Sequence, residues 1–146
     1  MTPTRILPDL QCSILCEEVR QEANGNFFLI GVMDMVRVPQ LPITAHKLCL
    51  FNRWTAGLGN FTETTRLLAP DQTTVQRKNE VKFQMKDPQI NATTVTMFGN
   101  IEFTVAGSYF IEVLVDDVMK IRYPVNIVHV PQPNQGQGPA QPPPAK

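Results

Sequence analysis

The chain has 146 residues, of which 42% are hydrophobic and 18% are charged, and its 13 Lys and Arg residues balance 13 Asp and Glu residues. This length suits one domain, and no apolar run approaches the roughly 20 residues that span a bilayer. A net charge of zero gives no general attraction to nucleic acid or anionic membranes. Residues 1–9 contain no apolar segment typical of a secretory signal, so we expect a cytoplasmic protein with neither nucleic-acid nor membrane partners.

Residues 11–23 allow two interpretations. Leu15, Val19 and Ala23 have helical spacing, and Asn24-Gly25 would end a helix well. Alternatively, residues 10–16 alternate as in a strand, and Asn24-Gly25 turns a hairpin into the next strand. We favour the strand because a lone helix would interrupt an otherwise all-β series, but the helix stays open.

The middle of the chain has shorter strand signals. Residues 27–33, FFLIGVM, form a continuous apolar run that predicts a central strand buried on both faces. Residues 48–51 repeat this pattern in a shorter form. Residues 64–68 lead into a turn at 70–73, and residues 81–85 alternate between apolar and polar. Each of these segments is therefore expected to be a strand.

The clearest signal lies between residues 95 and 127. Apolar residues alternate with polar ones along 95–105, 109–115 and 119–127, and Asp116-Asp117 supplies a tight turn. Such alternation is typical of antiparallel strands with one buried face. Together with the earlier segments, it predicts an all-β domain over residues 1–130, an antiparallel two-sheet sandwich of about seven or eight strands.

Residues 131–146, PQPNQGQGPAQPPPAK, differ abruptly in composition. A segment this poor in apolar residues cannot bury enough surface to offset its ordering entropy, so we expect a disordered tail. A ligand for a proline-binding module is the alternative interpretation.

Residues 16–32 and 103–116, CEEVRQEANGNFFLIGV and FTVAGSYFIEVLVD, resemble a family of small uncharacterised bacterial proteins classed as a domain of unknown function. The resemblance covers residues 9–128 and implies an immunoglobulin-like β-sandwich in a bacterial cytoplasm. It brings no catalytic residues. Gly107-Ser108-Tyr109 also resembles the tyrosine corner of such sandwiches, in which the hydroxyl binds upstream backbone, so a structural role is expected for Tyr109.

The sequence contains few residues suited to catalysis or metal binding. His46 and His129 lie outside any ligand spacing, and no nucleophile elbow or phosphate-binding loop is present. Cys12, Cys16 and Cys49 are too few for a disulfide scaffold and are interpreted as small buried hydrophobes in a reducing compartment, although a link from Cys49 to either of the others stays open. We therefore expect no enzyme, no metal and no cofactor.

The most suggestive segment for binding is residues 52–61, NRWTAGLGNF, which we expect to be a loop between strands. Arg53, Trp54 and Phe61 are its candidate binding residues, because Trp and Arg are frequent binding hot spots. The favoured function is a non-catalytic protein-binding or assembly module whose partner is an unknown protein or a second copy. A small-ligand or carbohydrate-binding sandwich that stacks its ligand on Trp54 is one alternative. An enzyme or metal site assembled across loops is the other.

Overall fold

The computed structural model describes residues 4–131. These residues form nine strands: β1 (Asp9–Gln21), β2 (Phe27–Val32), β3 (Met35–Val38), β4 (Ile43–Thr55), β5 (Gly59–Leu68), β6 (Val75–Met85), β7 (Ala92–Phe103), β8 (Gly107–Val115) and β9 (Val118–His129). No helix long and apolar enough to cross a membrane occurs in this part of the chain. The expected tail lies outside the described residues except for Pro131, as does its interpretation as a ligand.

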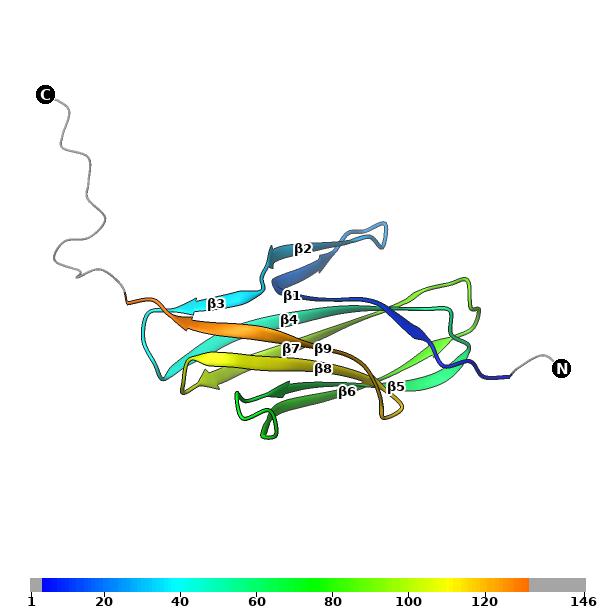
Figure 1. The fold of residues 1–146 in the computed structure, drawn as a ribbon. Helices are drawn as coiled ribbons and strands as arrows, with labels where there is room; N and C mark the ends of the chain where they lie inside the picture. Colours follow the sequence, from blue (N-terminus) through cyan, green and yellow to red (C-terminus); the bar gives the residue numbers. More distant parts are fainter. Residues whose placement is uncertain (1–3, 132–146) are drawn as a thin grey trace, which may run out of the picture.

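The strands form two facing sheets (Figure 1), one in the order β2-β1-β4-β7 and the other in the order β3-β9-β8-β5-β6. The prediction of an all-β, two-sheet sandwich is confirmed. The expected strand count was too low for the described residues, and the fully antiparallel arrangement was wrong, because β3 pairs with β9 in parallel. The chain crosses from the first sheet to the second between β2 and β3, and it enters the second sheet in the same direction as β9.

The strand order is that of an immunoglobulin-like sandwich. Strands β1, β4 and β7 take the places of A, B and E, and β9, β8 and β5 take those of G, F and C. The predicted tyrosine corner lies at the start of β8, where the Tyr109 hydroxyl donates a 2.8 Å hydrogen bond to the Val105 carbonyl. Tyr109 is buried and its ring packs edge-on against Phe103, with centroids 5.1 Å apart.

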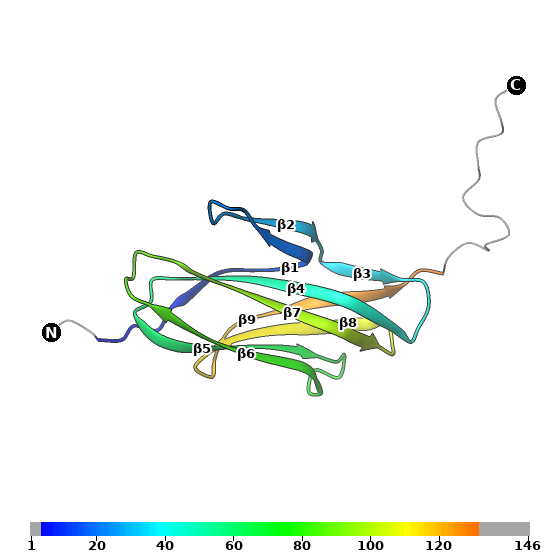
Figure 2. The same cartoon turned by 180° about the vertical axis from the view of Figure 1, so that it is seen from behind.

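The strand interpretation of residues 11–23 is confirmed, because β1 covers nearly all of them. Its first half pairs with β4 as far as Cys16, and its second half pairs with β2. In both views the backbone of the β1–β2 hairpin bends away from β4 and β7 (Figures 1 and 2). Its tip returns to the outer face of the first sheet, where Phe27 contacts Phe51 with ring centroids 5.5 Å apart.

The prediction of a central strand at residues 27–33 was wrong. Strand β2 lies at the edge of its sheet, and Phe28 and Val32 are 41% and 64% exposed. The run is apolar partly because Phe27 helps to cover the outer face of the sheet. Residues 48–51 do belong to a central strand, β4, and all four side chains are buried.

Polar contacts join the two sheets along both sides of the sandwich. On one side, the Asn79 amide donates to the Thr96 hydroxyl at 3.1 Å. On the other, Ser13 and Tyr123 hydroxyls lie 2.9 Å apart, and Lys120 pairs with Asp9 at 3.5 Å. The apolar core between the sheets is thus enclosed by polar links between strands that belong to different sheets.

Candidate functional site

The three predicted binding residues do not share a loop. Strand β4 continues to Thr55 and β5 begins at Gly59, so the connection is a tight turn. Arg53 and Trp54 therefore lie in β4, and Phe61 lies in β5. The glycines and the polar composition of this segment resemble those of a long loop, but regular pairing continues almost to the turn.

Trp54 lies inside the sandwich and is completely buried. Its indole stacks on Phe83, with centroids 5.6 Å apart, and its Nε1 donates a 2.8 Å hydrogen bond to Glu63 Oε1. A buried indole presents no face to a sugar ring, so Trp54 is not available as the stacking platform that the carbohydrate alternative requires. Arg53 is half-buried, and its guanidinium lies over the ring of Phe51.

Glu63 is the centre of a buried polar cluster that the sequence analysis missed. Besides Trp54, the Thr94 hydroxyl donates to Glu63 Oε1 at 2.5 Å and the Asn52 amide donates at 3.2 Å. These donors come from β4 and β7, whereas Glu63 is on β5, so the cluster joins the two sheets. The only sequence signal is the alternation of Phe61, Glu63 and Thr65, which places Glu63 on the inward face. The carboxylate of Glu63 is inaccessible to solvent, and its hydrogen bonds hold the two sheets together.

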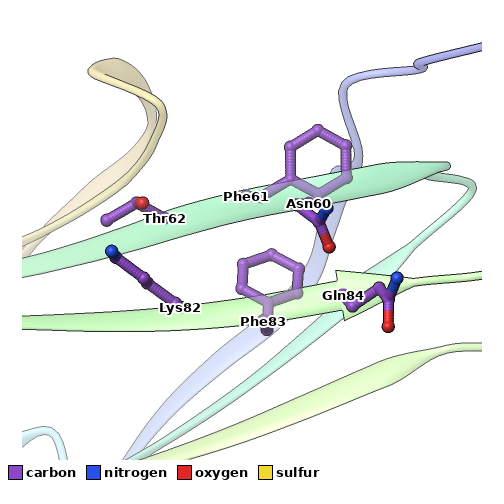
Figure 3. Close-up of a pocket in the computed structure, with 6 residues that line it drawn as sticks. All are labelled: Asn60, Phe61, Thr62, Lys82, Phe83 and Gln84. Carbon is purple, nitrogen blue, oxygen red and sulfur yellow. The ribbon is translucent and has the colours of Figure 1, made fainter.

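Phe61 lines a shallow depression of about 480 Å³ on strands β5 and β6 (Figure 3). The depression covers three consecutive cross-strand pairs, Asn60–Gln84, Phe61–Phe83 and Thr62–Lys82. Phe61 is only 3% exposed, and the guanidinium of Arg5 lies 4.6 Å from its ring centroid. The rings of Phe61 and Phe83 form most of the bottom of the depression, and both already pack against other side chains.

Strand β2 offers a different surface, because its only strand neighbour among the described residues is β1. Its sequence, FFLIGV, contains no charged residue. The edge strand β6 of the second sheet is protected differently: Lys78, Glu80 and Lys82 point outward and are exposed. Charges on an edge discourage unwanted pairing, so β2 is the less protected of these two edges.

A groove of about 670 Å³ adjoins β2 where the chain passes to β3. Apolar side chains contribute to it from Val32 through Val36 and from the start of β4, and Glu17, Arg37 and His46 add polar groups. Lys47 also lines the groove and donates to Glu18 at 3.1 Å. Lys47, together with Arg20, holds the pKa of Glu18 below its ordinary value. The groove therefore combines an apolar lining with charges of both signs.

No group of three or more potential metal-ligating His, Cys, Asp or Glu residues occurs within residues 4–131. A small acidic depression near the β8–β9 turn contains Glu80, Asp116 and Asp117, but Asp116 pairs with Arg5 and accepts a hydrogen bond from the Thr62 amide. The two histidines are separated: His46 lines the groove, and His129 lies at the end of β9, where it contacts the Pro39 carbonyl.

The family model for a family of unknown function, DUF6941, matches residues 11–128. The chain belongs to DUF6941. The match covers the sandwich from β1 to β9, in agreement with the resemblance found in the sequence. No curated protein matches the chain.

A crystallised immunoglobulin-like protein from Pseudomonas aeruginosa is similar to this DUF6941 chain over 86% of its length and 99% of that protein's length. The two sequences are 16% identical and the TM-score is 0.40. The immunoglobulin-like assignment rests on the strand order and the tyrosine corner.

Proposed function

We propose that the chain is a non-catalytic assembly module in which β2 pairs with β2 of a second copy. The observation that carries the proposal is the uncharged, half-exposed edge of β2. Exposed edge strands present unpaired backbone donors and acceptors, which recruit another strand unless charge or cover prevents it. Pairing would satisfy these groups and bury part of Phe28 and Val32.

A second copy suits this edge for two reasons. Two β2 strands brought together place no like charges side by side, and the net charge of the chain is zero. An antiparallel pair of identical strands is also self-complementary, which closes a two-fold dimer and leaves no further edge of the same kind. The two β1–β2 hairpins would then become one four-stranded sheet across the dimer axis.

The neighbouring groove supports the same arrangement. It begins at Gly31 and Val32, the end of β2 that would lie beside Phe27 and Phe28 of the other copy. Apolar side chains from that copy could cover its exposed apolar lining. A reducing, cytoplasmic setting is part of the proposal and is supported by the low number of cysteines, three in 146 residues, which is too few for a disulfide scaffold.

The test is the oligomeric state of the full-length protein in reducing buffer, measured by native mass spectrometry and by light scattering on a sizing column. We expect a dimer that the double variant F28K/V32K converts to a monomer, because lysines on an edge strand oppose pairing. The control is V75K/V118K, which also places two lysines at exposed apolar positions, but outside β2, and should leave the dimer intact.

Two results would overturn the proposal. A wild-type protein that stays monomeric at the highest soluble concentration excludes self-pairing, and the free edge would then have to accept a segment of a different protein. A dimer that survives F28K/V32K but is lost in V75K/V118K places the interface elsewhere. Circular dichroism of each variant checks that the sandwich is still folded.

A further inference from the structure

Cys16 and Cys49 lie directly opposite each other in the antiparallel pair of β1 and β4. Opposite residues in such a pair have Cα atoms about 4.5 or 5.5 Å apart, depending on the hydrogen-bonding position. Disulfides connect Cα atoms about 4.4–6.8 Å apart. Either spacing lies within this range, so the strand register brings Cys16 and Cys49 close enough for a disulfide. Both cysteines are free thiols.

We propose that Cys16 and Cys49 form a dithiol site that a low-molecular-weight disulfide oxidises to a cross-strand disulfide. In the first step, one protein thiolate attacks the small disulfide, forms a mixed disulfide and releases one small thiol. In the second step, the other protein thiolate attacks the protein sulfur of that mixed disulfide and releases the second small thiol. The protein loses two hydrogen atoms, and the small disulfide gains them as two thiols.

The surroundings determine how fast this site reacts. Cys16 and Cys49 are 0% and 4% exposed, and they lie on the outer face of the first sheet, where the β1–β2 hairpin returns. Burial, followed by the nearby Cys49 thiol, raises the pKa of Cys16, which lowers its thiolate fraction. Oxidation must therefore be slow in the closed protein and must depend on transient opening of the hairpin.

The position of Cys16 gives the bond a structural effect. Cys16 is opposite Cys49 on β4 and also opposite Val32 on β2, so it is the residue at which β1 passes from one partner to the other. A disulfide would fix β1 to β4 at this point. It would also close a loop that contains β2 and β3, which restricts the unfolded chain and stabilises the fold.

Cys12 is the internal comparison. It lies on the same strand but opposite Arg53, and it is half-buried. Trypsin leaves Cys12 and Cys16 in one peptide because no Lys or Arg separates them. The decisive protein is therefore full-length Cys12→Ser, in which only the proposed pair can form an internal bridge.

The experiment treats this variant with oxidised glutathione and maps its disulfides by mass spectrometry without reduction. We expect the peptide with Cys16 to be joined to the peptide with Cys49 inside one chain, with a higher urea midpoint than in the reduced protein. Adding Phe27→Ala, which removes the ring packed on Phe51, should speed the reaction several-fold.

The same mapping on the wild type uses fragmentation to separate Cys12 from Cys16, and it needs no substitution that could affect folding. A bridge between Cys12 and Cys49, or bridges only between chains, would overturn the proposal. It would also fail if the two thiols of folded Cys12→Ser stay reduced, or stop at mixed disulfides with glutathione, under conditions that modify Cys12 of the wild type.

Discussion

The indole of Trp54 on β4 donates its hydrogen bond to the carboxylate of Glu63 on β5, across the interior of the sandwich. This contact connects a central strand of the first sheet with a strand of the second. It also explains why the only tryptophan of the chain is unavailable for ligand binding. The residue that looked most suited to recognition instead holds an ionisable group inside the core.

Replacing Glu63 by leucine should destabilise the protein by about 3 kcal/mol or more. The change leaves three buried donors, from Asn52, Trp54 and Thr94, without their acceptor, and each unsatisfied buried group costs about 1–3 kcal/mol. Glu63→Gln is the matched control, because its amide oxygen can still accept, and it should cost clearly less. Urea unfolding measures both; equal losses for the two variants would contradict this account.

Removal of the Tyr109 hydroxyl should weaken the tyrosine corner. Tyr109→Phe keeps the ring against Phe103 but removes the 2.8 Å bond to the Val105 carbonyl. The expected loss is about 0.5–1.5 kcal/mol in the free energy of unfolding, the net contribution of one intramolecular hydrogen bond, because this bond is only partly buried. Thermal and urea unfolding of the two proteins measure the difference, and an unchanged stability would show that the corner contributes nothing.

Stability should fall at high pH because of Tyr123. Burial raises the pKa of Tyr123 from 10.0 to about 12, and its hydroxyl lies 2.9 Å from that of Ser13. The unfolded chain therefore loses this proton first, so the contribution is complete below pH 10 and is lost as pH rises towards 12. The decrease should reach roughly 2 kcal/mol.

The control for this pH effect is Tyr123→Phe. The relevant quantity is the difference between the two proteins in urea midpoint as pH rises, because Tyr123→Phe removes only this hydroxyl. The variant should lose less stability than the wild type over the window. Parallel curves for the two proteins would exclude Tyr123 as the cause.

Two glycines should respond oppositely to the same substitution. A Cβ at Gly57 would lie 2.6 Å from Pro8 Cβ and 2.7 Å from Met85 Sδ, whereas at Gly99 the nearest atom is the His46 carbonyl oxygen at 3.7 Å. Gly57→Ala should therefore cost about 1–3 kcal/mol through overpacking, and Gly99→Ala should be neutral or slightly stabilising. Urea unfolding midpoints of the two variants and the wild type measure these changes, and equal midpoints for Gly57→Ala and Gly99→Ala would contradict the expectation.

The sequence predicted the carboxyl-terminal strands well because each has one buried face and close neighbours along the chain. Strands β8 and β9 are joined by the Asp116-Asp117 turn, in which both residues have positive φ, 45° and 67°. Local information was sufficient for this hairpin. It was also sufficient for the tyrosine corner, since Tyr109 bonds to Val105, only four residues away.

Other features depend on packing that no local pattern contains. The apolar run at β2 has the same composition as a central strand, but β2 is an edge strand, and its Phe27 covers the outer face of the sheet at Phe51. Glu63 meets donors that are nine to 31 residues distant in sequence. Strand β3 pairs with β9 in parallel because the chain changes from one sheet to the other just before β3. The alternation of apolar and polar residues contains no information about where the chain changes sheets.

The parallel pair of β3 and β9 also affects how the molecule should respond to force. The first and last described residues lie at opposite ends of the sandwich (Figure 1), and four consecutive residues, Met35–Val38, run alongside the last part of β9. Once β1 and β2, which precede β3 in the chain, have been drawn out, a pull on the two ends acts along β3 and β9. The bonds between these two parallel strands are then sheared together instead of being peeled apart one by one. The short edge strand β3 can therefore act as a mechanical clamp on β9.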